Sequence, residues 1–404
     1  MEFYTHTLSN GIRCIHRRVR SQAACCALTI GSGSRDELPD QHGVAHLTEH
    51  ALFKGTARRH AYQVNCRLEN LGGELNAFTT KEETVIHAMT LKGDYAKAVE
   101  LICDMAFHST FPAAEVDKEK EVALEELYSL HDMPSELIFD RFEELIFNGS
   151  PLAHNILGAK SSISKLSREK IASFTARTYN TDAMVFSSVG NISRERFIAL
   201  MERYFGQEAS SLRTFRRSKP AGVDHFDTVV RKGSSQAHCI MGSTTYDLHD
   251  RRRLALSLLV NMLGGPAANS ILNVALRERN ALTYTVEANY TPFCDTGVAT
   301  IYFATEKSNL DRCFDLIYKE LERLRTRGPS SRQLSMAKRQ LAGQMALSLE
   351  NDENCNLGMG KSMLVYDSVD THAEIMHKVQ NITAMELVEA ARDTFGDMST
   401  LLFR

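Results

Sequence analysis

The sequence predicts an α+β protein of two related domains, each a mainly antiparallel sheet with helices packed on one side. Three observations support this. A chain of 404 residues is too long for one ordinary core and suits two domains of about 200 residues each. Strand-like and helix-like runs follow the same order in both halves. Between them, Ser, Arg, Lys and Pro cluster without apolar periodicity at 206–222. The expected domains are therefore 1–212 and 223–404, joined by a linker at 213–222.

In the first half, strand-like runs precede a short helix that carries two histidines. A second helix, a hairpin, further helices and a closing strand follow. The expected ranges are strands 13–16 and 23–30, helix 62–71, strands 75–79 and 84–91, helices to about 147 and strand 184–189.

The second half repeats this order, which indicates an internal duplication although direct identity between the halves is slight. The expected ranges are strands 227–231 and 237–243, helix 251–263, a helix ending near 279, strands 284–290 and 297–304, long helices and strand 400–403.

Composition excludes several classes of partner. Lys and Arg number 47 against 50 Asp and Glu, a formal net charge of −3, which gives no reason to expect binding to nucleic acid or to an anionic membrane. No apolar run approaches the ~18 residues that a transmembrane helix needs, and the first residues show no signal-peptide pattern. The nine cysteines are scattered and include no C-x-x-C pair, so we expect reduced thiols in a cytoplasmic protein.

Two charged segments have simple interpretations. The basic run 216–219 is more typical of a solvated linker than of a binding patch. The run 35–37, Arg-Asp-Glu, is most simply a polar turn after a strand.

The most informative motif is His46-Leu-Thr-Glu49-His50. Positions i, i+3 and i+4 of a helix share one face, so His46, Glu49 and His50 lie together on a single turn. Two neutral imidazoles at this spacing can clamp zinc, and the nearby carboxylate can take a proton from water. The order H-x-x-E-H is the inverted zincin motif. Histidine pairs alone are more often ordinary helix residues.

A catalytic zinc usually needs a third protein ligand from another element. The segment 115–128 reads as an amphipathic helix on which Glu119 and Glu126, seven residues apart, face the same way. One can bind the metal while the other orients a ligand histidine or the water. The alternative is that Glu119 is a solvated charge in an acidic helix.

Here the chain resembles a known family. The stretch 43–56, Gly-Val-Ala-His-Leu-Thr-Glu-His-Ala-Leu-Phe-Lys-Gly-Thr, is similar to the signature of the pitrilysin family of zinc metallopeptidases, which includes insulin-degrading enzyme and the mitochondrial processing peptidase. The similarity continues in Asn76-Ala-Phe-Thr79 and in the segment 276–284, Leu-Arg-Glu-Arg-Asn-Ala-Leu-Thr-Tyr, and covers nearly the whole chain.

The resemblance implies a role for each matching residue. The family's third ligand lies 76 residues beyond the second histidine, which is Glu126, and its supporting glutamate is Glu119. The implied zinc ligands are thus His46, His50 and Glu126, one Zn²⁺ per chain because the second half has no H-x-x-E-H. The remaining expected site residues are Glu49 and Glu119 for catalysis, and Asn76, Ala77, Phe78, Thr79, Arg277 and Tyr284 for substrate binding.

The expected reaction is hydrolysis of peptides or unfolded segments. Glu49 acts as general base toward a metal-activated water. The substrate lies extended along the strand 76–79, where Gly72-Gly73 allows close approach. Arg277 and Tyr284 contact it from the second domain. Their simpler interpretation is a cation at a helix end and a packed strand aromatic.

The resemblance also bears on assembly. Members of the family form a two-sided, clamshell-like shell of four related domains, and this chain supplies two. One chain carries both the zinc motif and the Arg/Tyr pair, which favours a homodimer enclosing a chamber. The alternatives are a non-catalytic subunit of a peptide-processing complex and a peptidase that works only with a separate partner.

Overall fold

The computed structural model describes residues 3–222 and 224–404, which form two compact units. Of the described residues, the first unit contains 3–128, 154–217 and 347–369, and the second contains 129–153, 218–222, 224–346 and 370–404. Both units are therefore assembled from segments that are distant in the sequence. The contiguous domains 1–212 and 223–404 stay a prediction about the duplicated halves.

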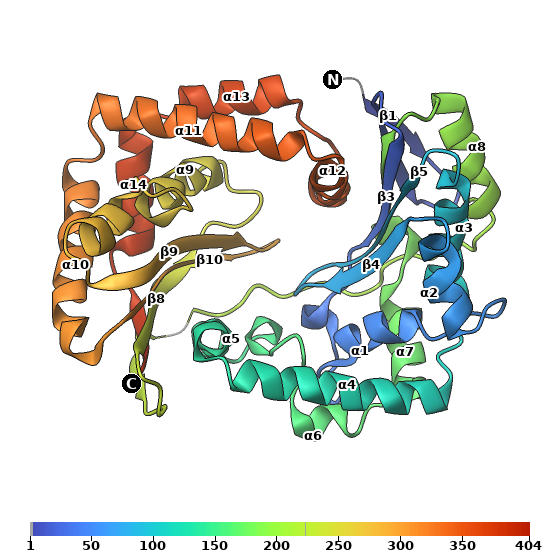
Figure 1. The fold of residues 1–404 in the computed structure, drawn as a ribbon, viewed down its shortest axis with the longest axis horizontal. Coiled ribbons are helices and arrows are strands. Elements are labelled where there is room, and N and C mark those ends of the chain that lie inside the picture. Colours follow the sequence, from blue (N-terminus) through green and yellow to red (C-terminus); the bar gives the residue numbers. More distant parts are fainter. Residues whose placement is uncertain (1–2, 223) are drawn as a thin grey trace. The chain divides into compact units, whose positions relative to one another are not determined.

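The first unit is built on a six-stranded sheet with strand order β1-β2-β6-β3-β5-β4. Its strands β1, β3, β4 and β5 are labelled in Figure 1. All neighbouring strands are antiparallel except β2 and β6, which are parallel. The strands are β1 (Phe3–Thr7), β2 (Arg13–Arg18), β3 (Ala23–Ile30), β4 (Glu74–Thr79), β5 (Thr84–Leu91) and β6 (Met184–Gly190).

Several helices of the first half contact this sheet, and α3 and α8 help to close the main apolar core. The α-helices are α1 (Val44–Leu52), α2 (Ala61–Glu69), α3 (Tyr95–His108), α4 (Ala113–His131), α6 (Lys160–Ile163), α7 (Arg168–Thr178) and α8 (Arg194–Tyr204). Two short 3-10 turns are η1 (Ser34–Asp36) and η3 (Thr181–Ala183).

The second unit has a five-stranded sheet in the order β7-β11-β8-β10-β9. Its strands are β7 (Asp227–Val230), β8 (Ala237–Thr245), β9 (Thr283–Pro292), β10 (Gly297–Thr305) and β11 (Ser399–Phe403). Its α-helices are α5 (Pro134–Ile146), α9 (Arg253–Gly264), α10 (Leu310–Thr326), α11 (Ser331–Leu349), α13 (His372–Asn381) and α14 (Ala384–Phe395). Shorter turns are η2 (Pro151–Ala153), the π-helical η4 (Asn273–Glu278) and η5 (Lys307–Asn309).

The two sheets share one topology once β1 is set aside. In each, the first strand pairs in parallel with the closing strand (β2 with β6, β7 with β11), and the remaining pairs are antiparallel. The edge strand β9 occupies the place in the second sheet that β4 occupies in the first. This correspondence supports an internal duplication and confirms the α+β class.

The sequence predicted helices on one side of each sheet, and the structure shows that each sheet also carries a helix on its other face. Helix α12 (Asp352–Tyr366), from the second half of the sequence, packs on β3 and β6 of the first unit. Its Cys355, Met359 and Met363 meet Ile15 and apolar residues of β6. Helix α5, from the first half, packs on β8 and β11 of the second unit. An apolar second face needs a cover, and the alternation of side chains along a strand does not reveal which segment supplies it.

All nine cysteines are free thiols in the structure. Among the residues that the structure describes, no helix combines the length and the apolar character needed to span a membrane.

Candidate active site

Helix α1 carries the H-x-x-E-H motif, and its first turn is held by a buried carboxylate. Glu37 accepts hydrogen bonds from the backbone N–H groups of Gly43 (3.0 Å) and Ala45 (2.9 Å). A negative group is favourable there because the first N–H groups of a helix lack partners. Gly43 has φ 91°, and a side chain on it would approach the Leu157 carbonyl to 2.8 Å. The helix is thus fixed at its start by the segment that precedes it.

The structure brings His46 and His50 of α1 together with Glu126 of α4. The two Nε2 atoms lie 3.2 Å apart. The Glu126 Oε2 atom lies 3.3 Å from Nε2 of His46 and 3.7 Å from Nε2 of His50. The imidazoles are largely buried, whereas 44% of the Glu126 side chain is exposed.

These three atoms fit a tetrahedral cation. An ion with bonds of about 2.0–2.1 Å separates neighbouring ligand atoms by about 3.3–3.4 Å. The triangle found here, with sides of 3.2, 3.3 and 3.7 Å, is close to one face of such a tetrahedron. Two imidazoles and one carboxylate are also a donor set that zinc uses in catalytic sites. The three side chains can therefore hold zinc and leave one position open.

Glu119 is buried, so it is not a solvated charge. Its Oε2 atom lies 3.0 Å from Nδ1 of His50, and its Oε1 atom forms an ion pair with Nζ of Lys54 at 2.8 Å. A carboxylate on Nδ1 fixes the tautomer that leaves Nε2 for a metal. Lys54, one turn after His50, was not singled out from the sequence. Its i+4 spacing from His50 was the available signal.

Glu49 is bound to the strand on which the substrate is expected to lie. Thr79 of β4 donates a hydrogen bond of 2.6 Å to Oε2 of Glu49. In the metal-free site, burial raises the pKa of Glu49, and the hydrogen bond from Thr79 opposes that rise. Position 79 thus joins the strand to the carboxylate.

We expect Thr79→Val to lower kcat roughly tenfold, because a hydrogen bond to a charged group is worth about 1.5–3 kcal/mol and its loss lets the carboxylate rotate. Thr79→Ser keeps the hydroxyl and should retain most of the rate. Steady-state kinetics on zinc-loaded protein will measure both. A change in KM alone would instead assign Thr79 only to substrate binding.

Burial lowers the pKa of His46 to about 4 in the metal-free site, and the neighbouring His50 adds to the effect. An imidazole that stays neutral keeps its lone pair for a metal. Within residues 3–222 and 224–404, the buried Nδ1 atom of His46 has no hydrogen-bond partner. Only His50 therefore has a carboxylate behind its ring.

The pKa shift of His46 has a consequence for stability. Between pH ~6.5 and ~4 the unfolded chain protonates this residue and the folded metal-free protein does not. The contribution of the neutral His46 to the free energy of unfolding is therefore complete above pH ~6.5 and is lost as the pH falls toward ~4. Urea unfolding of zinc-free protein should therefore show a steeper loss of stability over this window for the parent than for His46→Gln. Equal slopes would contradict the assignment.

The predicted substrate strand is an edge strand. Asn76, Ala77, Phe78 and Thr79 lie on β4, which pairs with β5 and has no strand on its other side among the described residues. The preceding glycines act differently from expectation. Gly72 has φ 72° and open space around it, but a side chain on Gly73 would come within 2.8 Å of the Met89 carbonyl. Gly73 therefore serves packing against β5.

Arg277 and Tyr284 lie together in the second unit. Arg277 belongs to η4, Tyr284 is the second residue of the edge strand β9, and the guanidinium lies 5.3 Å from the centre of the tyrosine ring. The tyrosine is 81% exposed, so it is not a packed core aromatic. Both line a cavity of about 420 Å³ with Gly264, Gly265 and residues of β9.

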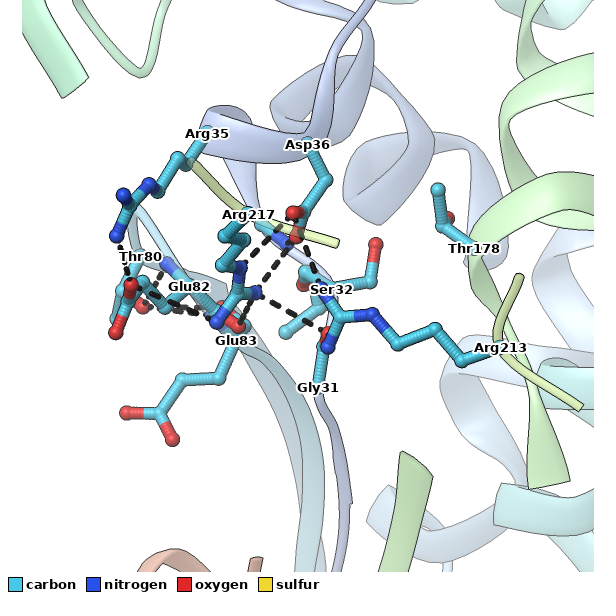
Figure 2. Close-up of polar contacts among 12 residues, drawn as sticks. Gly31, Ser32, Arg35, Asp36, Thr80, Glu82, Glu83, Thr178, Arg213 and Arg217 are labelled. Carbon is cyan, nitrogen blue, oxygen red and sulfur yellow. Dashed lines mark hydrogen bonds and ion pairs between the residues drawn. The ribbon is translucent and has the colours of Figure 1, made fainter. Parts of the chain in front are cut away.

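Two interpretations of charged segments were wrong. Arg217 is not part of a solvated linker, because its side chain is 12% exposed and pairs with Asp36 and Glu82 (Figure 2). Arg35, Asp36 and Glu37 are buried and do not form a simple polar turn. Sequence charge does not report burial, and the carboxylates bound to Arg217 lie more than a hundred positions earlier in the chain.

Comparison with known proteins agrees with this geometry. Residues 15–160 match the model of the insulinase family, peptidase family M16, and residues 165–341 match the model named peptidase M16 inactive domain. An uncharacterized zinc protease of Bacillus subtilis, YmxG, is 30% identical over 97% of this chain and 95% of its own length. The chain belongs to the M16 family.

Other relatives extend the comparison of this M16 chain. An uncharacterized zinc protease of Mycobacterium tuberculosis is 29% identical over 96% of this chain and 89% of its own length. A protease of Helicobacter pylori has a TM-score of 0.91 at 20% identity, covering 100% of this chain and 99% of that one. A structure described as a peptidase M16 inactive domain, from Pseudomonas fluorescens, has a TM-score of 0.90 at 22% identity and covers 100% and 98%. These structures share the fold.

Proposed function

We propose that this M16 chain is a zinc-dependent endopeptidase that hydrolyses peptides or unfolded segments. One observation carries the proposal. Three ligand atoms of His46, His50 and Glu126 lie at tetrahedral spacing, and the Glu49 carboxylate on the same helix turn is held by the edge strand. The set combines a metal site, a base and a place for an extended substrate.

The chain's own residues divide the work. His46, His50 and Glu126 would hold one zinc ion per chain, and Glu119 orients His50 through Nδ1. When bound, zinc polarises the scissile carbonyl and lowers the pKa of water in its shell toward ~7. Glu49 accepts the proton of the attacking water at Oε1 and later passes it to the leaving amine.

Substrate binding by β-strand addition follows from the position of β4. Backbone groups along an unpaired edge bind an extended peptide through main-chain hydrogen bonds, with little preference for sequence. Asn76 to Thr79 would supply this edge. Arg277 and Tyr284 of the second unit would contact the same peptide, and the tyrosine hydroxyl would stabilise the oxyanion.

For assembly and location we propose a homodimer that encloses its sites in a chamber, and a cytoplasmic protein. A single chain carries the zinc motif and the Arg/Tyr pair, which supports a symmetric pair of identical subunits. Nine free thiols support a reducing compartment.

The test is cleavage of a mixed library of unstructured peptides by purified zinc-loaded protein, with and without a chelator. Cleavage that stops on zinc removal and returns on zinc addition is expected. Zinc bound at one per chain without any cleavage would reject an independent peptidase. Sedimentation of the same sample then separates a homodimer from a chain that needs a different partner.

A further inference from the structure

A largely buried ionic cluster joins the segment at the end of the first unit, 213–217, to two loops beside the candidate active site, 31–37 and 80–83. It consists of Arg35, Asp36, Glu82, Arg213 and Arg217 (Figure 2). The side chains of Arg35 and Asp36 are each 1% exposed. Charges buried to this degree require paired geometry, so the arrangement is held tightly.

The guanidinium of Arg217 links its own segment to two others, 31–36 and the turn that contains Glu82. It donates to the Asp36 carboxylate through Nε (2.9 Å) and Nη2 (2.7 Å), and to the carbonyls of Glu82 (2.6 Å) and Gly31 (3.2 Å). Arg213 adds bonds to Asp36 (3.3 Å) and to the carbonyl of Gly31 (3.1 Å). A planar group with several fixed donors suits such multiple attachment better than a lysine.

The first loop leads directly to the metal helix. Asp36 is followed by Glu37, whose carboxylate receives the N–H groups of Gly43 and Ala45 at the start of α1. Asp36 and Glu37 are adjacent in the chain, so a shift of Asp36 would also move the carboxylate that binds the start of α1, the helix with His46 and His50.

The second loop joins the substrate strand to its neighbour. Glu82 lies in the turn between β4 and β5, three residues after Thr79, which binds Glu49. The two loops also bind each other, since the N–H groups of Ser34 and Arg35 donate to the carbonyls of Thr80 (3.1 Å) and Lys81 (2.8 Å). Arg217 therefore links the loop before α1, the helix with His46 and His50, to the turn that follows the edge strand β4.

We propose that Arg217, supported by Arg213, is a positioning residue of the peptidase site: it holds α1 and the β4–β5 turn in one arrangement, so that the segment between the halves sets the rate of turnover. The inference rests on the proposed function. Because misplacement by about 1 Å can cost up to ~100-fold in rate, loss of one such bridge should lower kcat by roughly tenfold.

The experiment compares Arg217→Gln with Arg216→Gln. Arg216 is the adjacent arginine with an exposed side chain, so its substitution removes the same charge without touching the cluster. We expect kcat per bound zinc to fall roughly tenfold for Arg217→Gln, with little change in KM or zinc content, and to stay at the parental value for Arg216→Gln. Arg217→Lys, which keeps the charge but loses the forked donation, should fall between them and replaces Arg217→Gln if that variant does not fold.

Hydrogen exchange supplies a readout that is independent of activity. Amides in 31–37 and 80–83 should exchange faster in Arg217→Gln than in Arg216→Gln. An active parent with equal kcat in both variants would overturn the positioning role, as would unchanged exchange in the two loops. A parent that cleaves no peptide would reject the proposed function, while the exchange comparison would still decide whether Arg217 holds the loops.

Discussion

Glu49→Gln is expected to reduce peptide hydrolysis by on the order of a thousandfold or more while zinc stays bound at one per chain. The amide has the shape of the carboxylate but cannot accept the proton of the attacking water. Glu49 contributes no atom to the triangle of His46, His50 and Glu126, so the metal site should remain intact. The measurement is kcat/KM on a peptide from the library, together with zinc content by elemental analysis.

The control for this variant is Glu125→Gln, which removes an exposed carboxylate from α4. It should leave both kcat/KM and zinc content at the parental values. Residual activity of Glu49→Gln above about a tenth of the parent would assign the proton transfer to another group. A simultaneous loss of zinc would show that the variant damages the metal site. Glu49→Asp would then serve to test Glu49 as the general base.

Glu126→Ala is expected to weaken zinc binding more than any other single change on α4. It removes one of the three proposed ligand atoms, and the loss should exceed the roughly 10- to 100-fold that removal of an orienting partner costs. Activity at limiting zinc should fall in parallel. Competition with a chelator of known affinity measures the dissociation constant directly.

Three glutamates of this helix give a graded test. Glu125→Ala should leave zinc affinity unchanged, Glu119→Gln should weaken it by roughly 10- to 100-fold through His50, and Glu126→Ala should weaken it further. The order depends on direct ligation by Glu126 and indirect action by Glu119. If Glu119→Gln lost more zinc than Glu126→Ala, the two roles would be exchanged.

Regular periodicity made much of this protein predictable. His46, Glu49 and His50 share a helix face because they stand at positions i, i+3 and i+4. Glu119 and Glu126 share one because they are seven residues apart. Most strands were predicted because short apolar runs bounded by turn residues are a local property of the sequence, and their repeated order indicated the duplication. The family signature then assigned roles that spacing alone left open between Glu119 and Glu126.

Contacts across long sequence separations were decided by the tertiary structure alone. No local pattern places the Thr79 hydroxyl on Glu49 or Lys54 against Glu119. The same holds for α12, which covers a sheet built from the opposite half of the sequence. Whether a charged or apolar side chain is buried depends on which distant segment arrives to cover it.

The sequence by itself determined the H-x-x-E-H motif and predicted the α+β class and the order of strands and helices in each half, because these follow from local residue spacing. Only the tertiary structure decided that Arg217 is largely buried against Asp36 and Glu82, and that Glu37 accepts hydrogen bonds from the first N–H groups of α1. The physical reason is that a charge acquires its partner, its burial and its pKa from neighbours that folding brings together, and those neighbours are not adjacent in the chain.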